Sequence, residues 1–156
     1  MMKNDRNGFS IVELVIAVFI IGIVTAMAAL GWQSYVLNAN LRSAARDIVT
    51  DFQNCKVKAG SESRDYTITF DQGANSYTIS SPATTLPAVS TVKSPTVHGR
   101  GIQISNANYG MSGSIITFKS RGTSSAGTAT LTNTGGSTAI ITTNTAGKAY
   151  VTFNMQ

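Results

Sequence analysis

A single apolar run near the N-terminus, residues 9–30, constrains this chain more than any other feature. It reads FSIVELVIAVFIIGIVTAMAAL and is apolar except for Ser10, Glu13 and Thr25. As an α-helix, 22 residues would extend about 33 Å, enough to cross a hydrocarbon core of about 30 Å. A secretory signal peptide with a small-residue cleavage site at 27–29 fits this run, and so does a plain membrane anchor.

Neither interpretation explains Glu13. A carboxylate within a membrane span costs about 2.5–3.5 kcal/mol on insertion scales, so such a residue usually has a specific partner. Cleavage between Gly8 and Phe9 would create one, because the new α-amine of Phe9 would lie one helical turn from Glu13 and within reach of Glu13 in a neighbouring copy. Pairing the two groups compensates both charges. The alternative is a glutamate tolerated at the membrane edge.

The residues around this glutamate resemble a known signal. The segment 8–14, GFSIVEL, is similar to the class III signal of type IV pilins and type II secretion pseudopilins. The resemblance implies a leader at 1–8 that prepilin peptidase removes after Gly8, followed by N-methylation of Phe9. It also implies that Glu13 is the residue used in filament assembly.

Two further segments narrow the resemblance. Residues 40–47 (NLRSAARD) and 117–123 (TFKSRGT), with a Gly147-Lys148 turn, are similar to the GspH/FimT group of minor pseudopilins and minor pilins. The group implies a structural subunit that enters or primes a filament. Its implied partners are other pilin or pseudopilin subunits, prepilin peptidase, the inner-membrane assembly platform and the lipid bilayer.

The same resemblance implies a location. The chain would cross the bacterial inner membrane once, with its C-terminal domain in the periplasm, or would be incorporated in an envelope or extracellular filament. Whether that filament is a type IV pilus or a type II secretion pseudopilus stays open, as does major against minor subunit.

Beyond the membrane run, the apolar pattern predicts that the helix continues over 31–60. Apolar residues recur at helical spacing and form one face, and charged residues such as Arg42, Asp47 and Asp51 lie mostly off it. Gly60 is a helix stop, so the helix has about 50 residues. The residues of this face are Leu41, Ala45, Ile48, Phe52 and Cys55.

The remaining residues, 61–156, read as a β-rich domain. Alternating residues at 66–70 and 77–79 flank turn residues and predict a hairpin. The segment 81–100 holds all three prolines and reads as a loop. Together with the helix this predicts an α+β fold in which a long helix packs on an antiparallel sheet or sandwich. Further strands are expected near 101–105, 114–119, 127–133, 138–144 and 148–154.

The composition argues against an enzyme. One Cys excludes an internal disulfide and a multi-Cys metal site, and one His excludes a paired-His centre. No acidic residue follows Asp71, and no local catalytic constellation or phosphate loop is present. We therefore expect no catalysis, no metal and no cofactor. Cys55 is expected to be a buried core residue and His98 an exposed loop residue.

The basic C-terminal region suggests an alternative function. The five basic residues of 72–156 face no acid, which suits contact with phosphates. FimT-like minor pilins involved in DNA uptake carry a C-terminal Gly-Arg-x-Arg motif, and the matching residues here are Gly147-Lys148-Ala149-Tyr150. The opposing interpretation is that these cations only keep the domain soluble. The candidate DNA contacts are Lys119, Arg121, Lys148 and Tyr150, with the tyrosine able to stack on a base.

Overall fold

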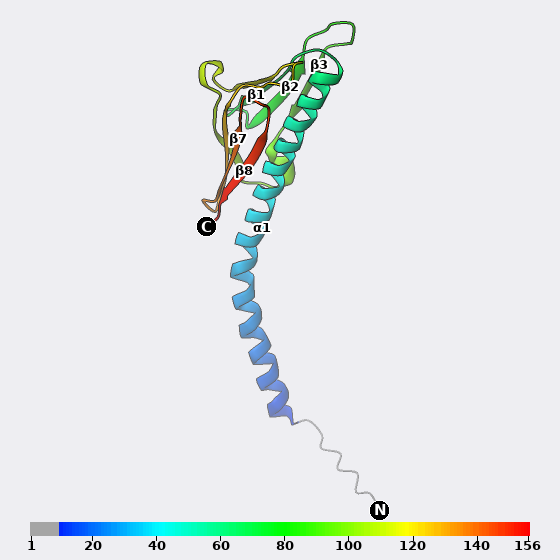
Figure 1. Cartoon of the computed structure of the whole chain (residues 1–156). Helices are drawn as coiled ribbons and strands as arrows, with labels where there is room; N and C mark the ends of the chain where they lie inside the picture. Colours follow the sequence, from blue (N-terminus) through cyan, green and yellow to red (C-terminus); the bar gives the residue numbers. More distant parts are fainter. Residues whose placement is uncertain (1–9) are drawn as a thin grey trace, which may run out of the picture. The chain divides into compact units, whose positions relative to one another are not determined.

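The structure is a computed structural model that describes residues 10–156 (Figure 1). The chain forms two compact units, Met1–Tyr35 and Val36–Gln156. Both draw on one helix, α1 (Ile11–Ser61), whose 51 residues agree with the predicted length. The predicted leader at 1–8 and Phe9 lie outside the described residues.

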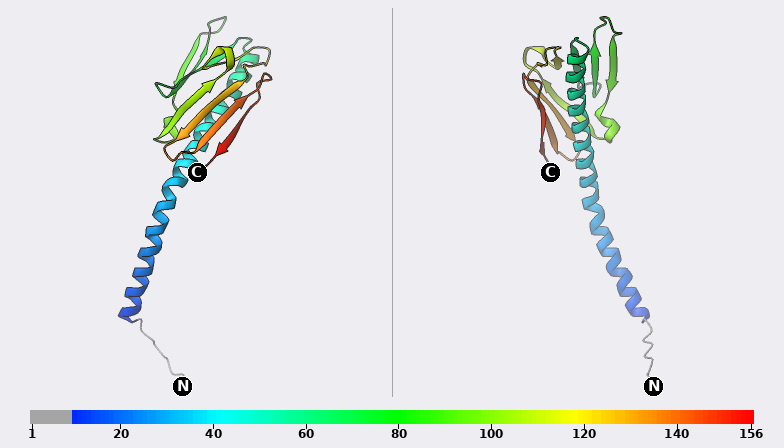
Figure 2. Two further views of the ribbon diagram at one scale, coloured as in Figure 1. Left: turned by 90° about the vertical axis from the view of Figure 1, so that its left-hand side faces the viewer. Right: turned by 45° about the vertical axis from the view of Figure 1, so that its right-hand side comes forward.

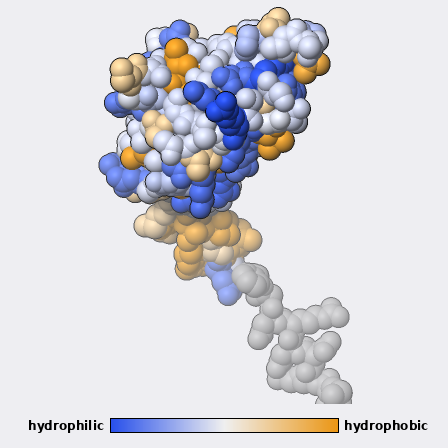
Figure 3. All heavy atoms as spheres, turned by 45° about the horizontal axis from the view of Figure 1, so that its top comes forward, coloured by the Kyte–Doolittle hydropathy of each residue, from blue (hydrophilic) through white to orange (hydrophobic). Residues whose placement is uncertain are grey.

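The first unit is the apolar half of α1. The Oγ of Ser10 accepts a hydrogen bond from the backbone N–H of Val12 at 3.3 Å, and Ser10 is a residue type favoured just before a helix. The branched and aromatic side chains from Ile11 to Met27 are exposed, and the visible face of this segment is hydrophobic in Figure 3. By length and composition, α1 is long and apolar enough to cross a membrane.

The second unit combines the other half of α1 with two four-stranded antiparallel sheets. One sheet has the strand order β3-β2-β1-β5 and the other the order β4-β6-β7-β8. In the right-hand view of Figure 2, the two sheets lie on either side of the helix. The predicted α+β fold is confirmed. The strands are β1 (Tyr66–Asp71), β2 (Ser76–Ser81), β3 (Val89–Lys93), β4 (Ile102–Asn108), β5 (Ile115–Phe118), β6 (Gly127–Asn133), β7 (Thr138–Thr143) and β8 (Ala149–Asn154).

The predicted apolar face of the helix is the centre of the core. Leu41, Ala45, Ile48, Phe52 and Cys55 are all buried. The ring of Phe52 contacts those of Phe70 and Phe118, with centroids 6.2 and 5.6 Å apart. Each large side chain buried in this way contributes about 1.5–3 kcal/mol. The spacing of apolar residues along α1 therefore determines which face of the helix packs against the sheets.

The side chain of Asn75 links the β1–β2 turn of the first sheet to β4 of the second. Asn75 lies in the β1–β2 turn with a positive φ of 49°, a conformation that asparagine tolerates. Its Nδ2 donates to the carbonyl oxygen of Ile102 at 2.8 Å, and its Oδ1 accepts from the N–H of Ile104 at 2.8 Å. The amide thereby satisfies backbone groups of β4 as a neighbouring strand would.

The prediction of a loop at 81–100 is wrong in part. This segment contains β3, which pairs antiparallel with β2 from Tyr77↔Lys93 to Ser81↔Val89, and the 3₁₀ helix η1 (Pro95–His98). The prolines masked the strand in the sequence, but they flank it and leave its backbone donors intact. A second short 3₁₀ helix, η2, spans Gly110–Ser112. β4 also runs past its predicted end at 105, through an irregularity between Ile104 and Asn106 that breaks the alternation.

Candidate functional site

The first candidate site is the start of α1. Glu13 lies in the first helical turn, where the helix dipole favours a negative charge. Its side chain is exposed, and so are those of its apolar neighbours Val12 and Leu14. Among the described residues no ion pair involves Glu13. A carboxylate on an apolar helix surface is suited to accept a cation from another chain. The proposed amine partner, Phe9, and the cleavage residue Gly8 lie outside the described residues.

The second candidate site is the basic region of the C-terminal half. The structure brings the turn at 119–123 beside the turn at 144–148, because the N–H of Ser124 donates to the carbonyl oxygen of Thr145 at 3.0 Å. Lys119 and Lys148 border two hollows that share Ala146, and Arg121 is exposed in the first turn. Three of the four predicted contacts are therefore carried by neighbouring turns.

Tyr150, the fourth, is half exposed and lies two residues after Lys148 on the outward face of β8. The structure adds a cation that the sequence analysis missed. Lys56 of α1 donates from Nζ to the carbonyl oxygen of Ala146 at 2.8 Å. An acid is nearby as well, because Asp65 accepts from the N–H of Ser120 at 3.0 Å. No local signal in the sequence connects 56 with 146.

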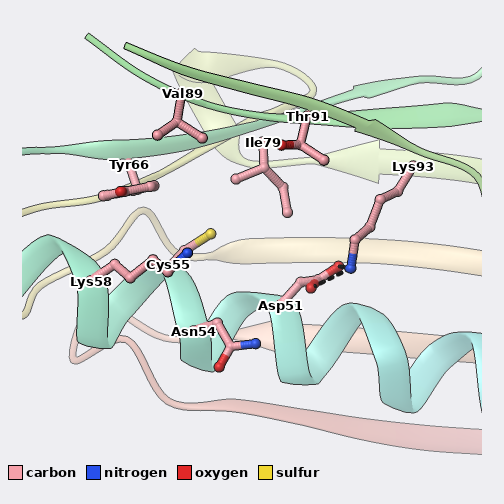
Figure 4. Close-up of a pocket in the computed structure, with 9 residues that line it drawn as sticks. All are labelled: Asp51, Asn54, Cys55, Lys58, Tyr66, Ile79, Val89, Thr91 and Lys93. Atoms are coloured by element: carbon pink, nitrogen blue, oxygen red, sulfur yellow. Dashed lines mark hydrogen bonds and ion pairs between the residues drawn. The ribbon is translucent and has the colours of Figure 1, made fainter. Parts of the chain in front are cut away.

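The third candidate site is a cavity of about 190 Å³ between α1 and the β3-β2-β1 side of the first sheet, shown in Figure 4. Asp51 is buried there, which corrects the expectation that it lies off the packed face. Lys93 on β3 donates from Nζ to both carboxylate oxygens at 2.7 and 2.8 Å, and the hydroxyl of Tyr77 donates to Oδ2 at 2.7 Å. The strand missed in the sequence supplies the cation that compensates this buried acid.

The environment of the cavity changes the chemistry of its groups. Burial, and secondarily the Asp51 charge, raises the pKa of the Cys55 thiol to about 12. Burial, then the hydrogen bond to Asp51, raises the pKa of Tyr77 well above its ordinary value. The hydrogen bond to Asp51 raises the pKa of Lys93. The thiol is therefore protonated at neutral pH and is a core side chain rather than a nucleophile.

His98 also differs from its expected role. It lies in η1 rather than in an exposed loop and is only partly exposed, with Nε2 at 3.3 Å from Oδ2 of Asp47 on α1. Asp47 and Asp51 thus both hold the β3–η1 segment, the first through His98 and the second through Lys93. In the part of the chain that the structure describes, no Ser or Thr hydroxyl is hydrogen-bonded to this histidine. Within the same residues, no group of three or more potential metal ligands occurs.

Comparison with known proteins gives two findings. Residues 3–29 match a family described as the prokaryotic N-terminal methylation motif. The chain carries a prokaryotic N-terminal methylation motif. The match covers the segment 8–14 on which the resemblance was based, so that resemblance is confirmed.

The second finding concerns the fold. The chain is similar to the minor pseudopilin EpsH from the type 2 secretion system of Vibrio cholerae, with a TM-score of 0.59 and 10% identity. The similarity covers 72% of this chain and 96% of that one. A comparison with curated proteins gives no match. The motif and the fold together support a pilin- or pseudopilin-type structural subunit, and they fit membrane anchoring or filament incorporation.

Proposed function

We propose that this chain is a minor pilin or pseudopilin that assembles into, or primes, a type IV pilus or a type II secretion pseudopilus. The observation that carries the proposal is the methylation motif at 3–29, continued by an exposed apolar helix with Glu13 in its first turn. The similarity of the fold to that of the minor pseudopilin EpsH also supports the proposal.

The proposed sequence of events begins in the bacterial inner membrane, which residues 9–30 cross once with the second unit in the periplasm. Prepilin peptidase cuts after Gly8, and the new N-terminal Phe9 is methylated. Its amine keeps its charge, because methylation of an amine leaves it protonated at neutral pH.

Assembly then transfers the apolar half of α1 from lipid to neighbouring helices, through the inner-membrane assembly platform. The exposed apolar side chains of this segment fit such a change, because they can pack on other subunits as well as on acyl chains. Glu13 accepts the Phe9 amine of an adjacent subunit, so that neither charge enters the bundle alone.

The processing step gives the direct test. The full chain, carrying a C-terminal tag and produced in a strain with an intact pilus or secretion system, is purified from membranes and its N-terminus is read by mass spectrometry. We expect N-methylated Phe9 as the first residue. A matched sample from a strain without prepilin peptidase should begin before Gly8. A mature chain that begins near Leu30 would contradict the proposal and favour a secretory signal peptide.

DNA binding is the second candidate function. The observation in its favour is the convergence of the turns at 119–123 and 144–148, with Lys56 beside them. Against it stands Asp65, which lowers the local positive potential next to Ser120. A FimT-like role in DNA uptake would use Lys119, Arg121 and Lys148 on phosphates and Tyr150 on a base.

A salt series separates this function from simple solubility. If the cluster binds DNA, a mobility shift of the full chain in detergent should weaken with salt, and Lys119→Ala or Lys148→Ala should each reduce the salt slope by about 0.9. Arg100→Ala is the control, because this arginine lies outside both turns. No shift at low salt would exclude the DNA-binding role and leave the structural role intact.

A further inference from the structure

Two aromatic side chains follow the apolar run 9–30, and neither has a role in the functions proposed above. Trp32 and Tyr35 are 69% and 68% exposed, and their rings lie 6.2 Å apart between centroids with an interplanar angle of 38°. They are spaced i and i+3, so they share one face of α1. Both belong to the first unit, as does Glu13.

We propose that Trp32 and Tyr35 anchor α1 at the membrane–water interface on the periplasmic side and so set the depth of Glu13 in the bilayer. The inference rests on the proposed function, in which this helix crosses the inner membrane. The partner of the aromatic pair is the headgroup region of the phospholipids.

The position of the pair in the sequence supports this partner. The polar residues Gln33 and Ser34 separate Trp32 from Tyr35 in the sequence, and the apolar run 9–30 ends two residues before Trp32. Trp and Tyr are enriched at membrane interfaces because the ring is apolar and its N–H or O–H is polar. Exposure leaves the indole N–H and the phenol O–H free to bind headgroup oxygens and water.

The distance along α1 between Glu13 and Trp32 matches the thickness of the membrane. Glu13 precedes Trp32 by 19 residues, which is about 28 Å of helix, close to the hydrocarbon thickness of about 30 Å. With Trp32 at one interface, Glu13 therefore reaches the opposite one. The carboxylate of an isolated subunit lies near water, and its pairing with Phe9 becomes necessary when the helix leaves the bilayer for the filament.

The natural protein carries its own probe, because Trp32 is the one tryptophan of the chain. The full chain is reconstituted at low protein-to-lipid ratio in phosphatidylcholine vesicles whose acyl chains are brominated either near the headgroup or near the methyl end. Bromine quenches tryptophan at short range. We expect quenching to be roughly twofold stronger with bromine near the headgroup.

The matched control places the tryptophan within the membrane-spanning segment. In the double variant Trp32→Phe, Val24→Trp the single tryptophan lies about 12 Å further along the helix, so its preference should be reversed. Tyr35→Ala keeps the natural probe and removes half of the anchor, and the quenching of Trp32 by the deeper bromine should increase. The proposal is overturned if Trp32 behaves like the Val24→Trp control, or if Tyr35→Ala leaves the quenching profile unchanged.

Vesicle flotation tests the membrane anchoring of the chain separately from the aromatic anchor. Chains that do not float with the vesicles would contradict the membrane anchoring of the proposed function. Chains that float but show Trp32 unquenched by either lipid would overturn the aromatic anchor alone. Protection of Trp32 that grows with protein-to-lipid ratio would assign the pair to contact between subunits instead, and would also overturn it.

Discussion

At the scale of single residues, Glu13 and Asp51 show two ways of keeping an acid in apolar surroundings. Asp51 is buried and has its partners within the chain, Lys93 and Tyr77. Glu13 is exposed on an apolar helix and has no ion-pair partner among the described residues. The first acid stabilises a fold, and the second is left for another molecule.

Replacing Glu13 should affect assembly but not folding. Glu13→Gln keeps the shape and removes the charge, so a charge-assisted hydrogen bond of about 1.5–3 kcal/mol is lost. Incorporation into sheared filaments should therefore fall by about tenfold or more. Immunoblots of the filament fraction measure it, and the melting curve of the second unit should not move. Unchanged incorporation of Glu13→Gln would contradict the amine-pairing role.

Replacing Asp51 should act on stability instead. Asp51→Asn removes the negative charge and one of the two acceptor oxygens that Lys93 and Tyr77 use, and should cost about 1–3 kcal/mol, with the lower end favoured because Lys93 is partly exposed. Denaturant unfolding of Asp51→Asn, Lys93→Gln and the double variant measures the coupling. Additive effects would show that the pair contributes nothing of its own.

Lys93 and Tyr77, the two donors to Asp51, also predict how the stability of the fold changes with pH. The pKa of Lys93 and that of Tyr77 are both raised in the fold, so their stabilising effect is complete below the unfolded values, near pH 10, and is lost as pH rises through the folded values. The melting temperature should therefore fall from about pH 10 upward, and it should fall less in Tyr77→Phe.

At the scale of elements, the β3–η1 segment is held on α1 by side chains on one face of the helix. Asn40, Asp47 and Asp51 recur at spacings of seven and four, which places them on one stripe. Gly99 ends η1 at φ 154° and packs directly on Asn40. Two features favour glycine here: a backbone conformation that residues with a side chain rarely adopt, and the close approach to the Asn40 side chain.

A methyl group at this glycine should therefore loosen the segment. In Gly99→Ala the new Cβ would collide with the Asn40 amide, and we expect a loss of about 1–3 kcal/mol in the free energy of unfolding. Gly110→Ala is the control, since Gly110 also has a positive φ but no atom lies within 4 Å of its added Cβ. Asn40→Ala should rescue part of the Gly99→Ala defect. Equal losses at both glycines would point to backbone strain rather than to the contact.

At the scale of the whole molecule, folding depends on the second unit and assembly is proposed to depend on the first. Every buried hydrophobic side chain among the described residues lies in the second unit, from Leu41 to Ile141. The first unit exposes its apolar side chains instead, to the surroundings that lipid or other subunits would supply.

This division predicts that Val36–Gln156 folds without the first 35 residues. Its melting temperature should stay within a few degrees of that of the full chain in detergent, because truncation removes none of the buried side chains found among the described residues. Circular dichroism measures the transition, and a broad, non-cooperative transition of the truncated chain would contradict the prediction.

What the sequence by itself determined were the features set by local order along the chain. The apolar run, the motif around Gly8 and Glu13, the helical face from Leu41 to Cys55 and most strands depend on periodicity and spacing, which neighbours in sequence define. The candidate DNA contacts were found from charge and from the motif resemblance at 147–150.

Only the tertiary structure decided what depends on contacts between distant segments. The burial of Asp51 depends on Lys93 arriving from 42 residues away, and the strand that carries this lysine was hidden between prolines. The His98–Asp47 contact and the position of Lys56 beside Ala146 have the same origin. A charged side chain can be buried once its partner is in place, and the identity of that partner is fixed by packing rather than by local sequence.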